Sequence, residues 1–300
     1  MNGFRRVLAL SGVLAVLAAG GCGKSAGGTA DTGLDLTGAV TVDEGLRAQL
    51  PQSVRDRGAI RLLTDASYAP MEFFGVDGRT VIGFSPDLAT ALGRVLGIRV
   101  ELVVGDFATS LEEMNKGTYD GVFSSMTDSA EREKKADFVD YFSAGVSILV
   151  QSGNPAHISK LTDLCGQPVA AEAGTFQEDM FLRAQKTCGD RPMAIESTKT
   201  NADALLRLRT GRAVGVLQDF PMASYLVKNS KTSMYFQFAS TEQYEPGLFG
   251  IAVSKKNTGL RDALCGALNR LIKTGTYGEL IKRWDLGDGA VTEATINAWD

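Results

Sequence analysis

An arginine that closely follows a run of hydroxyl residues is a clear candidate for binding chemistry. The stretch SSMTDSAER begins with Ser124 and Ser125, contains Thr127 and ends at Arg132. The planar guanidinium group of arginine can donate to both oxygens of a carboxylate at once, which lysine cannot do. The hydroxyls and the nearby backbone groups supply further donors and acceptors. Taken alone, Arg132 could also be a charge on the surface of a helix.

A carboxylate of opposite charge, Asp219, ends a second candidate segment. It closes the strand-like sequence VLQD and stands just before Phe220 and Pro221. Ligands of α/β sheets bind beyond the carboxyl ends of the strands, so a carboxylate placed there could meet a cation. The alternative is that Asp219 only caps the helix that begins near Pro221.

The elements that must position these residues alternate between strand and helix. In the first part of the chain, strands are predicted at residues 59–64, 98–104 and 121–123. A helix is predicted between the first two, with Ser85 as N-cap, Pro86 as the first helical residue and Gly97 as the stop. A short helix is predicted at residues 111–115. This order indicates an α/β sheet with parallel strands.

The same alternation starts again after residue 152, which suggests a second α/β unit. Its predicted strands are residues 167–171, 194–196 and 213–217, and its predicted helices are residues 175–186 and 201–209. A third piece follows, with a strand at residues 249–254 and helices at residues 260–274 and 277–284. The residue pattern alone gives no reason to join this third piece to the first unit.

Composition and charge exclude several classes of protein. Of the 300 residues, 44% are hydrophobic and 22% are charged, which is typical of a soluble globular protein rather than a disordered or wholly membrane-embedded one. The net charge of −4 offers no basic excess for nucleic acid, which is therefore not an expected partner. His157 is the single histidine, and we expect it in a solvated loop. We expect no metal and no cofactor.

The first residues have the features of an export signal. Arg5 and Arg6 precede an apolar run at residues 7–19, which is too short to span a bilayer. Small residues then lead to Cys22, in a pattern that resembles a bacterial lipoprotein signal, in which the cysteine sulfur takes a diacylglyceryl group. We therefore predict a lipoprotein signal peptide at residues 1–21, lipidation at Cys22 and a flexible tether at residues 22–40. The alternative is ordinary secretion with a cysteine there by chance.

Several segments together resemble the extracytoplasmic solute-binding proteins of amino-acid ABC transporters, in the polar amino-acid family (bacterial solute-binding protein family 3). The segments are TDASYAPMEF from residue 64, IGFSPDLA from 82, YDGVFSSMT from 119 with Glu131 and Arg132, DFVDYF from 137, GTFQE from 174 and GTY from 275. The resemblance covers roughly residues 55–287. It implies a type II periplasmic-binding-protein-like fold, in which two α/β lobes are joined by two crossing strands and ligand binds in the cleft between them.

The resemblance also implies how the chain divides. Lobe 1 would be residues 41–145 together with 246–300, and lobe 2 would be residues 146–245 with hinge strands at its ends. The crossing strands would fall near residues 145–151 and 243–251. The lobes of such a protein close over the ligand by a hinge motion.

The resemblance assigns groups to the two charges of a free amino acid. It implies that Ser124, Ser125, Thr127 and Arg132 bind the ligand's carboxylate and amino groups. Asp219 would take the α-ammonium group. Thr175 would add a hydroxyl or a helix N-terminal N–H for the carboxylate. Many relatives carry a second hydroxyl where Phe176 stands, so the pocket should be more apolar there.

The side chain of the ligand is harder to predict. Asp65, Tyr68 and Phe107 match positions that hold a cationic side chain in the lysine/arginine/ornithine-binding relatives, with Asp106 and Glu72 adding negative charge nearby. Aromatic faces would flank the aliphatic stem while the carboxylate meets the charge. Asp65 could instead only cap the turn that follows the first strand. A cationic ligand is favoured over a neutral polar one such as glutamine, and an acidic ligand is favoured least.

Export to an oxidising compartment allows disulfides. Cys165 and Cys188 stand on either side of a predicted strand–helix unit, and their ends can reach the same edge, so we predict a disulfide between them. Cys265 lies among the leucines of the predicted helix at residues 260–274 and should be a buried free thiol.

These features together predict a monomeric, non-enzymatic binding lipoprotein, anchored to the outer side of the cell membrane, that captures an amino acid and delivers it to an ABC permease. Arginine, lysine, ornithine and histidine are the best guesses for the ligand, followed by glutamine. The alternative is an enzyme on the same fold that resembles cyclohexadienyl or arogenate dehydratases. Such an enzyme needs a protonated cleft carboxyl, for which Glu172 or Glu178 could be nominated. A sensor module is a third, weaker alternative.

Overall fold

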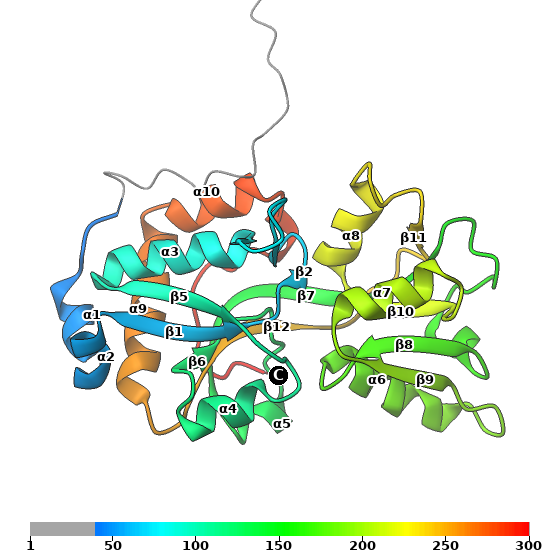
Figure 1. Cartoon of the computed structure of the whole chain (residues 1–300), viewed down its shortest axis with the longest axis horizontal. Helices are drawn as coiled ribbons and strands as arrows, with labels where there is room; N and C mark the ends of the chain where they lie inside the picture. Colours follow the sequence, from blue (N-terminus) through cyan, green and yellow to red (C-terminus); the bar gives the residue numbers. More distant parts are fainter. Residues whose placement is uncertain (1–39, 300) are drawn as a thin grey trace, which may run out of the picture.

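One mixed sheet of nine strands runs through residues 40–299, the part of the chain that the computed structural model describes (Figure 1). The strand order is β5-β1-β6-β12-β7-β10-β8-β9, and β11 also pairs with β7. The strands are β1 (Ala59–Thr64), β5 (Arg99–Val104), β6 (Gly121–Val122), β7 (Asp137–Gln151), β8 (Pro168–Glu172), β9 (Ala194–Thr198), β10 (Gly215–Asp219), β11 (Phe236–Phe238) and β12 (Tyr244–Val253). The predicted signal peptide, Cys22 and residues 23–39 of the tether lie outside the described residues.

The two long strands β7 and β12 join two lobes. They pair antiparallel from Asp137 opposite Val253 to Val146 opposite Tyr244, with irregularities in the register on the way. Beyond Val146, β7 pairs with β10 and β11 instead. Each strand therefore begins in one lobe and ends in the other.

Lobe 1 forms around β5, β1 and β6, which are mutually parallel. The first and third pieces of the sequence come together here, because β12 pairs with β6 and the long helix α9 packs against α3. Its helices are α1 (Glu44–Gln49), α2 (Gln52–Arg57), α3 (Phe84–Leu96), α4 (Ser110–Lys116), α5 (Ala130–Glu133), α9 (Thr258–Lys273) and α10 (Thr276–Arg283). A small separate sheet adds β2 (Ser67–Tyr68), β3 (Glu72–Phe74) and β4 (Val81–Ile82).

Lobe 2 is built on β10, β8 and β9, where neighbouring strands are parallel. Its α-helices are α6 (Phe176–Ala184), α7 (Asn201–Arg209) and α8 (Phe220–Lys228). Figure 1 shows α6 below the sheet and α7 and α8 above it. Apolar side chains on both faces form two core clusters, and burying them supplies most of the lobe's stability. The α/β architecture with two lobes agrees with the sequence-based expectation.

The start of α3 differs from the prediction. The helix begins at Phe84 with Gly83 as its N-cap, so Ser85 and Pro86 lie inside the first turn. Gly83 has φ of 135°, and a Cβ there would lie 2.2 Å from the carbonyl oxygen of Met71. Only glycine fits this position. The Ser85 hydroxyl is used elsewhere, in a 2.5 Å hydrogen bond to the buried carboxyl of Glu72.

The C-terminal segment at residues 290–299 forms a strap along β7 that the sequence did not predict. Backbone hydrogen bonds join Asp140 to Thr295 and Asn297 to Phe138. Trp299 then reaches lobe 2, where its ring packs edge-on against Phe176 with 5.9 Å between ring centres.

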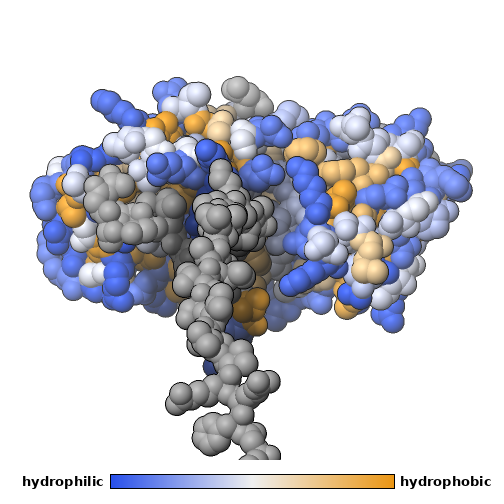
Figure 2. Space-filling view, turned by 90° about the horizontal axis from the view of Figure 1, so that it is seen from above, coloured by the Kyte–Doolittle hydropathy of each residue, from blue (hydrophilic) through white to orange (hydrophobic). Residues whose placement is uncertain are grey.

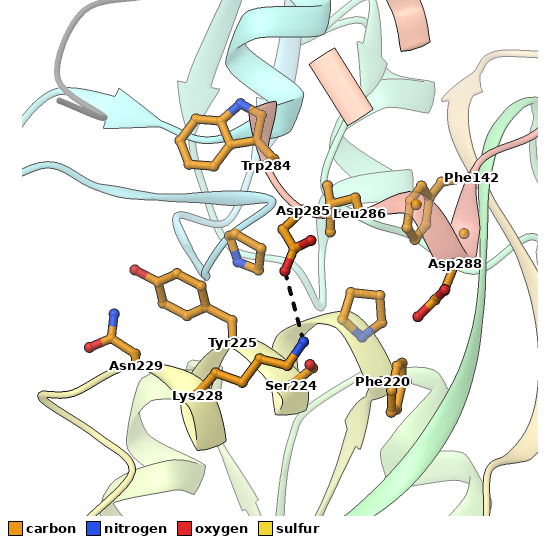
Figure 3. Close-up of a pocket in the computed structure, with 14 residues that line it drawn as sticks. Phe142, Phe220, Ser224, Tyr225, Lys228, Asn229, Trp284, Asp285, Leu286 and Asp288 are labelled. Carbon is orange, nitrogen blue, oxygen red and sulfur yellow. Dashed lines mark ion pairs between the residues drawn. The ribbon is translucent and has the colours of Figure 1, made fainter. Parts of the chain in front are cut away.

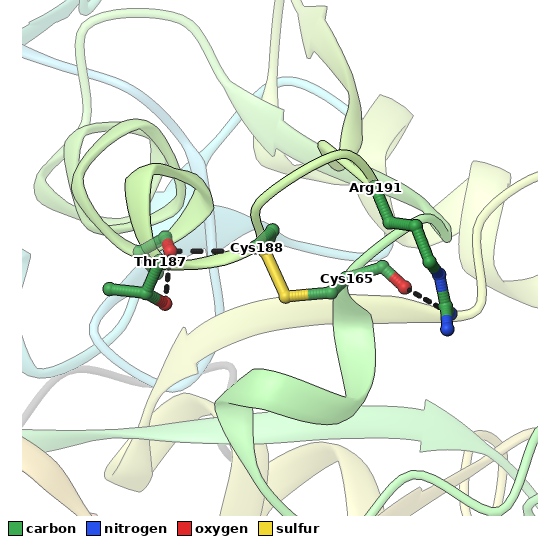
Figure 4. The surroundings of a disulfide bond; sticks show 5 residues. Cys165, Thr187, Cys188 and Arg191 are labelled. Carbon is green, nitrogen blue, oxygen red and sulfur yellow. Dashed lines mark hydrogen bonds between the residues drawn. A yellow bond between two sulfur atoms is a disulfide. The ribbon is translucent and has the colours of Figure 1, made fainter.

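The predicted disulfide between Cys165 and Cys188 is present, with their Cα atoms 5.3 Å apart (Figure 4). It ties the segment before β8 to the end of the helical segment after it, and Arg191 donates a 2.9 Å hydrogen bond to the carbonyl of Cys165. Cys265 is a free thiol, but it is half-buried rather than fully buried. Its sulfur lies 3.6 Å from the carbonyl oxygen of Ala294 in the C-terminal strap. His157 is exposed, in the loop after β7.

The surface seen from above is largely hydrophilic, with apolar side chains gathered in patches that include part of lobe 2 (Figure 2). Within residues 40–299, no helix has the length and apolar character needed to cross a bilayer. In the same part of the chain, no cluster of three or more His, Cys, Asp or Glu side chains is arranged to hold a metal ion.

Candidate functional site

A small cavity between the lobes brings together almost all of the residues that the sequence singled out. Its free volume is about 10 Å³, so the side chains of the two lobes nearly fill it. Lobe 1 contributes Tyr68, Phe107, Ser124, Ser125, Thr127 and Arg132, and lobe 2 contributes Thr175, Phe176, Gln177 and Asp219. Asp65 is the one predicted ligand-binding residue that does not line it. Gln177 lines the cavity although it was not predicted to do so.

Arg132 lies on the short helix α5 and reaches across the cleft. Its Nη1 donates a 2.8 Å hydrogen bond to the carbonyl of Thr127, and its Nη2 donates a 3.0 Å hydrogen bond to the carbonyl of Gly174 in lobe 2. The guanidinium also lies over the ring of Phe107, 5.6 Å from its centre. Removal from water lowers the pKa of Arg132 to about 10, so it remains charged at neutral pH.

Asp219 faces Arg132 from the other lobe. It is the last residue of β10 and occupies the N-cap position of α8, but its side chain makes no capping hydrogen bond. The carboxyl group is therefore left for the cavity, which argues against the purely structural role considered above. Burial raises the pKa of Asp219 to about 7, and the nearby Gln177 amide and the charge of Arg132 act in the opposite direction.

Two polar atoms of the cavity wall have unused hydrogen-bonding capacity. Oγ of Ser125 and Nε2 of Gln177 are buried and make no hydrogen bond of ordinary geometry within residues 40–299. Buried polar groups normally have a partner, because an unpaired one costs about 1–3 kcal/mol. A polar ligand in the cavity could supply these partners.

Of the two groups predicted at Thr175, the hydroxyl and a helix N-terminal N–H, the hydroxyl has partners within the protein. It caps α6, since it accepts a 3.1 Å hydrogen bond from the backbone N–H of Glu178 and donates one of 2.7 Å to the carbonyl of Glu172. The hydroxyl is thus already engaged, and the free N–H groups at the start of α6 are what this end of the cavity offers to a carboxylate. Phe176 lines the cavity and separates it from Trp299.

Carboxyl groups gather on one side of the cavity, behind Tyr68. Asp65, Glu72 and Glu172 are all buried. The Tyr68 hydroxyl donates a 2.5 Å hydrogen bond to Oε2 of Glu172, which belongs to lobe 2. Burial raises the pKa of Glu72 to about 8 and that of Glu172 to about 9, and the charge of Asp65 adds to both effects.

The side chain of Asp65 belongs to this cluster of carboxyl groups, and its backbone contacts a residue that lines the cavity. Its N–H donates a 2.8 Å hydrogen bond to Oγ of Ser124. From the sequence, Glu172 is a candidate only for the enzymatic alternative, and no motif predicts its contact with Tyr68. Its position at the carboxyl end of β8, two residues before Gly174, is the signal that could have placed it at the cleft.

The lobes are closed on each other. Besides the contacts of Arg132 and Tyr68, Nδ2 of Asn201 in lobe 2 donates a 3.1 Å hydrogen bond to the carbonyl of Ser67 in lobe 1. A second, more open hollow lies between α8 and the segment after α10 (Figure 3), where Lys228 and Asp285 form a loose ion pair at 3.8 Å. Both of these side chains are largely exposed, so the pair adds little to closure.

The fold and the enclosed cavity between two hinged lobes define an extracellular solute-binding protein. Residues 60–288 match the family model of bacterial extracellular solute-binding proteins, family 3, and the chain belongs to this family.

Among the curated relatives is the arginine-binding protein ArgT of Corynebacterium glutamicum, which is 28% identical over 84% of this chain and 82% of its own. The L-cystine-binding protein TcyJ of Escherichia coli is 30% identical over 81% of this chain and 86% of its own. Among solved structures, an ancestral arginine-binding protein bound to arginine superposes with a TM-score of 0.70. It is 31% identical and matches over 76% of this chain and 98% of its own.

Proposed function

We propose that this protein captures a free amino acid with a cationic side chain outside the cell and delivers it to an ABC permease. The observation that carries the proposal is the cavity in which Arg132 of lobe 1 stands opposite Asp219 of lobe 2. The guanidinium would hold the α-carboxylate, and the carboxylate of Asp219 would hold the α-ammonium group. Charge-assisted hydrogen bonds of this kind are strongest in a closed site that excludes water.

The balance of charge around the cavity favours a cationic side chain on the ligand. Four carboxyl groups, those of Asp65, Glu72, Glu172 and Asp219, lie in or behind the cavity wall, against the single guanidinium of Arg132. After the α-ammonium has paired with Asp219, these acids can still bind a second cation, which would take the place of the protons that Glu72 and Glu172 hold at neutral pH. An acidic ligand would lack a partner for its second carboxylate, and a neutral one such as glutamine would form no ion pair with these acids. Arginine-binding relatives support the same choice.

Closure over the ligand is the protein's activity. A ligand that contacts Arg132 on one lobe and Asp219 on the other binds the closed form far better than the open one. It therefore shifts the hinge equilibrium by that difference in affinity. The closed form would then be what the permease recognises.

A lipid anchor is also proposed, from the sequence that precedes the two lobes. A lipid on Cys22 and the Gly-, Thr- and Ala-rich segment up to residue 40 would hold a monomeric protein near its permease. Metabolic labelling with a palmitate analogue tests it. The full-length chain should be labelled, and Cys22→Ala should not.

A thermal-shift screen against the twenty amino acids, ornithine and citrulline tests the ligand class. Arginine, lysine or ornithine at about 100 times its dissociation constant should stabilise the folded state by about 2.7 kcal/mol. Arg132→Ala serves as the control and should show no shift. A shift with glutamine or another neutral amino acid alone would contradict the cationic assignment, and no shift with any of them would remove the amino-acid proposal.

One observation favours a second candidate, a dehydratase-like enzyme. With its pKa raised to about 9, Glu172 is protonated at neutral pH, as the acid of such an enzyme must be. The other nominated residue, Glu178, instead accepts a hydrogen bond from the N–H of Gly174. Incubation with prephenate and arogenate tests the candidate, and release of the aromatic product by wild type but not by Glu172→Gln would support it over binding alone.

A further inference from the structure

Glu172 of lobe 2 faces two residues of lobe 1, Tyr68 and Asp65. Binding of the ligand's α-carboxylate and α-ammonium does not explain this arrangement. Oε2 of Glu172 accepts the 2.5 Å hydrogen bond from Tyr68, and burial and the nearby charge of Asp65 raise the pKa of its carboxyl group. Tyr68 and Asp65 both come from the segment directly after β1, whereas Glu172 ends β8. Two acids from opposite lobes therefore lie near each other, behind Tyr68 in the cavity wall.

The pair is buried and incompletely satisfied. Glu172 is 3% exposed and Asp65 is 5% exposed. Oε1 of Glu172 receives no hydrogen bond from any group in residues 40–299. Burial and the charge of Asp65 both disfavour the ionised form of Glu172, so Glu172 holds a proton when no cation lies beside it.

The groups that face the pair are a phenol, a further acid and a backbone amide. From lobe 1, Asp65 and Tyr68 face Glu172. From lobe 2, Asp219 lies further along the cavity wall and its charge acts on Tyr68, while the backbone of Asn201 lowers the pKa of Glu172. The nearest positive charge named at the cavity, Arg132, is engaged with Thr127 and Gly174.

We propose that Glu172 is a specificity-determining residue, which together with Asp65 clamps the distal cation of the ligand between the lobes, and that the ligand's cation takes the place of the proton on Glu172. This inference deepens the proposed function and rests on it. In the exchange, the O–H bond of Glu172 breaks, its proton leaves to the solvent buffer, and the carboxylate accepts hydrogen bonds from the guanidinium or ammonium of the ligand. Tyr68 keeps its hydrogen bond to Oε2 and forms the wall beside the ligand's aliphatic stem.

The clamp would make the protein selective because cationic, neutral and acidic ligands would bind with different affinities. A cationic ligand gains hydrogen bonds to carboxylates on both lobes, so it adds to closure as well as to binding. A neutral ligand leaves the protonated pair as it is and gains nothing there. A ligand with a second carboxylate meets two acids and is rejected.

Glu172→Gln tests the clamp, because the amide has the shape of the protonated carboxyl group and cannot ionise. Calorimetry should show that arginine binds about 10- to 150-fold more weakly. This loss in affinity corresponds to one hydrogen bond to a charged group. Neutral ligands such as glutamine should change by less than about threefold. Glu196→Gln is the matched control, since it removes the same charge from the adjacent strand β9 at a half-exposed position. It should leave arginine binding unchanged.

The number of protons released on binding is measured by repeating the calorimetric titrations at pH 7.5 in phosphate and in Tris. The ionisation enthalpies of these two buffers differ, so the difference in observed heat gives the proton count. Wild type should release nearly one more proton with arginine than with glutamine, and Glu172→Gln should abolish that difference. Asp219 meets the α-ammonium of both ligands, so its contribution cancels. Equal loss of arginine and glutamine affinity in Glu172→Gln, or equal proton counts in wild type, would overturn the inference. Failure of wild type to bind any cationic amino acid would instead overturn the proposed function.

Discussion

Nη2 of Arg132 donates a hydrogen bond of 3.0 Å to the carbonyl oxygen of Gly174, and the two residues belong to different lobes. Together with the bond from Nη1 to Thr127, this uses two of the five N–H groups of the guanidinium. The remaining donors are free for a ligand's carboxylate. One side chain can therefore hold the ligand and bridge the lobes at the same time.

Loss of this group should remove binding without unfolding the protein. We expect Arg132→Ala to weaken amino-acid binding at least about 100-fold, because a charge in the closed site would lose its partner. Arg132→Lys should recover only part of the loss, since an ammonium cannot form the paired, planar contact. Calorimetry measures the affinities, and circular dichroism should show an unchanged fold. Binding by Arg132→Ala within threefold of wild type would reject the site.

The closed, ligand-free form should become less stable as the pH rises. The pKa of Asp219 is raised to about 7 and that of Glu172 to about 9 in the closed cleft. Closed protein thus binds more protons than an open form in which both groups are hydrated with their ordinary pKa values near 4. The stability of closure is fully present below pH 4 and is lost as the pH passes through 7 to 9.

Small-angle scattering without ligand, at pH 5 and pH 9, measures this effect. The radius of gyration should increase at pH 9, and Asp219→Asn should reduce the change near pH 7. A more compact protein at pH 9 would show that these acids do not control closure. Saturating arginine should keep the protein closed at both pH values.

The disulfide should stabilise lobe 2 without taking part in binding. It links residues 23 positions apart, and loop closure of that length is worth about 3 kcal/mol. Replacing Cys165 and Cys188 by serine should lower the free energy of unfolding by about that amount in urea titrations. Cys265→Ser, which removes a free thiol from lobe 1, is the control and should cost less than half as much. Equal effects from both variants would argue against a stabilising disulfide.

Trp299 should report the motion of the lobes. Its ring packs against Phe176 of lobe 2 and lies over Gly247 of the crossing strand β12, where a side chain Cβ would come within 3.0 Å of it. Opening of the cleft would separate the two rings. In a Trp284→Phe background, where Trp299 is the remaining tryptophan, arginine should change the fluorescence emission. No change under conditions where calorimetry shows binding would mean that this contact does not follow closure.

Much of the local structure could be predicted from the sequence because it depends on neighbours in the chain. The helix predicted at residues 201–209 matches α7 in full, and β1 matches its predicted range. Apolar periodicity and capping residues act over a few positions and leave a readable pattern. The residues around the cavity could be predicted because they lie in segments that resemble a known family, and most of them line the cavity.

The features that were missed depend on contacts between distant residues. Ser85 was predicted as an N-cap, but the buried carboxyl of Glu72 takes its hydroxyl. The contact between Tyr68 and Glu172 spans 104 positions, and no local pattern announces it. The strap that ends at Trp299 has little apolar periodicity, since it is held by hydrogen bonds to β7. Such pairings become visible only once the lobes are assembled.

The most direct test of the account is a crystal structure of the protein grown with L-arginine. The account predicts the α-carboxylate on Arg132, the α-ammonium on Asp219 and the guanidinium of the ligand between Asp65 and Glu172. Arginine found outside the cavity, or lying in it with its charged groups away from Arg132 and Asp219, would contradict the account.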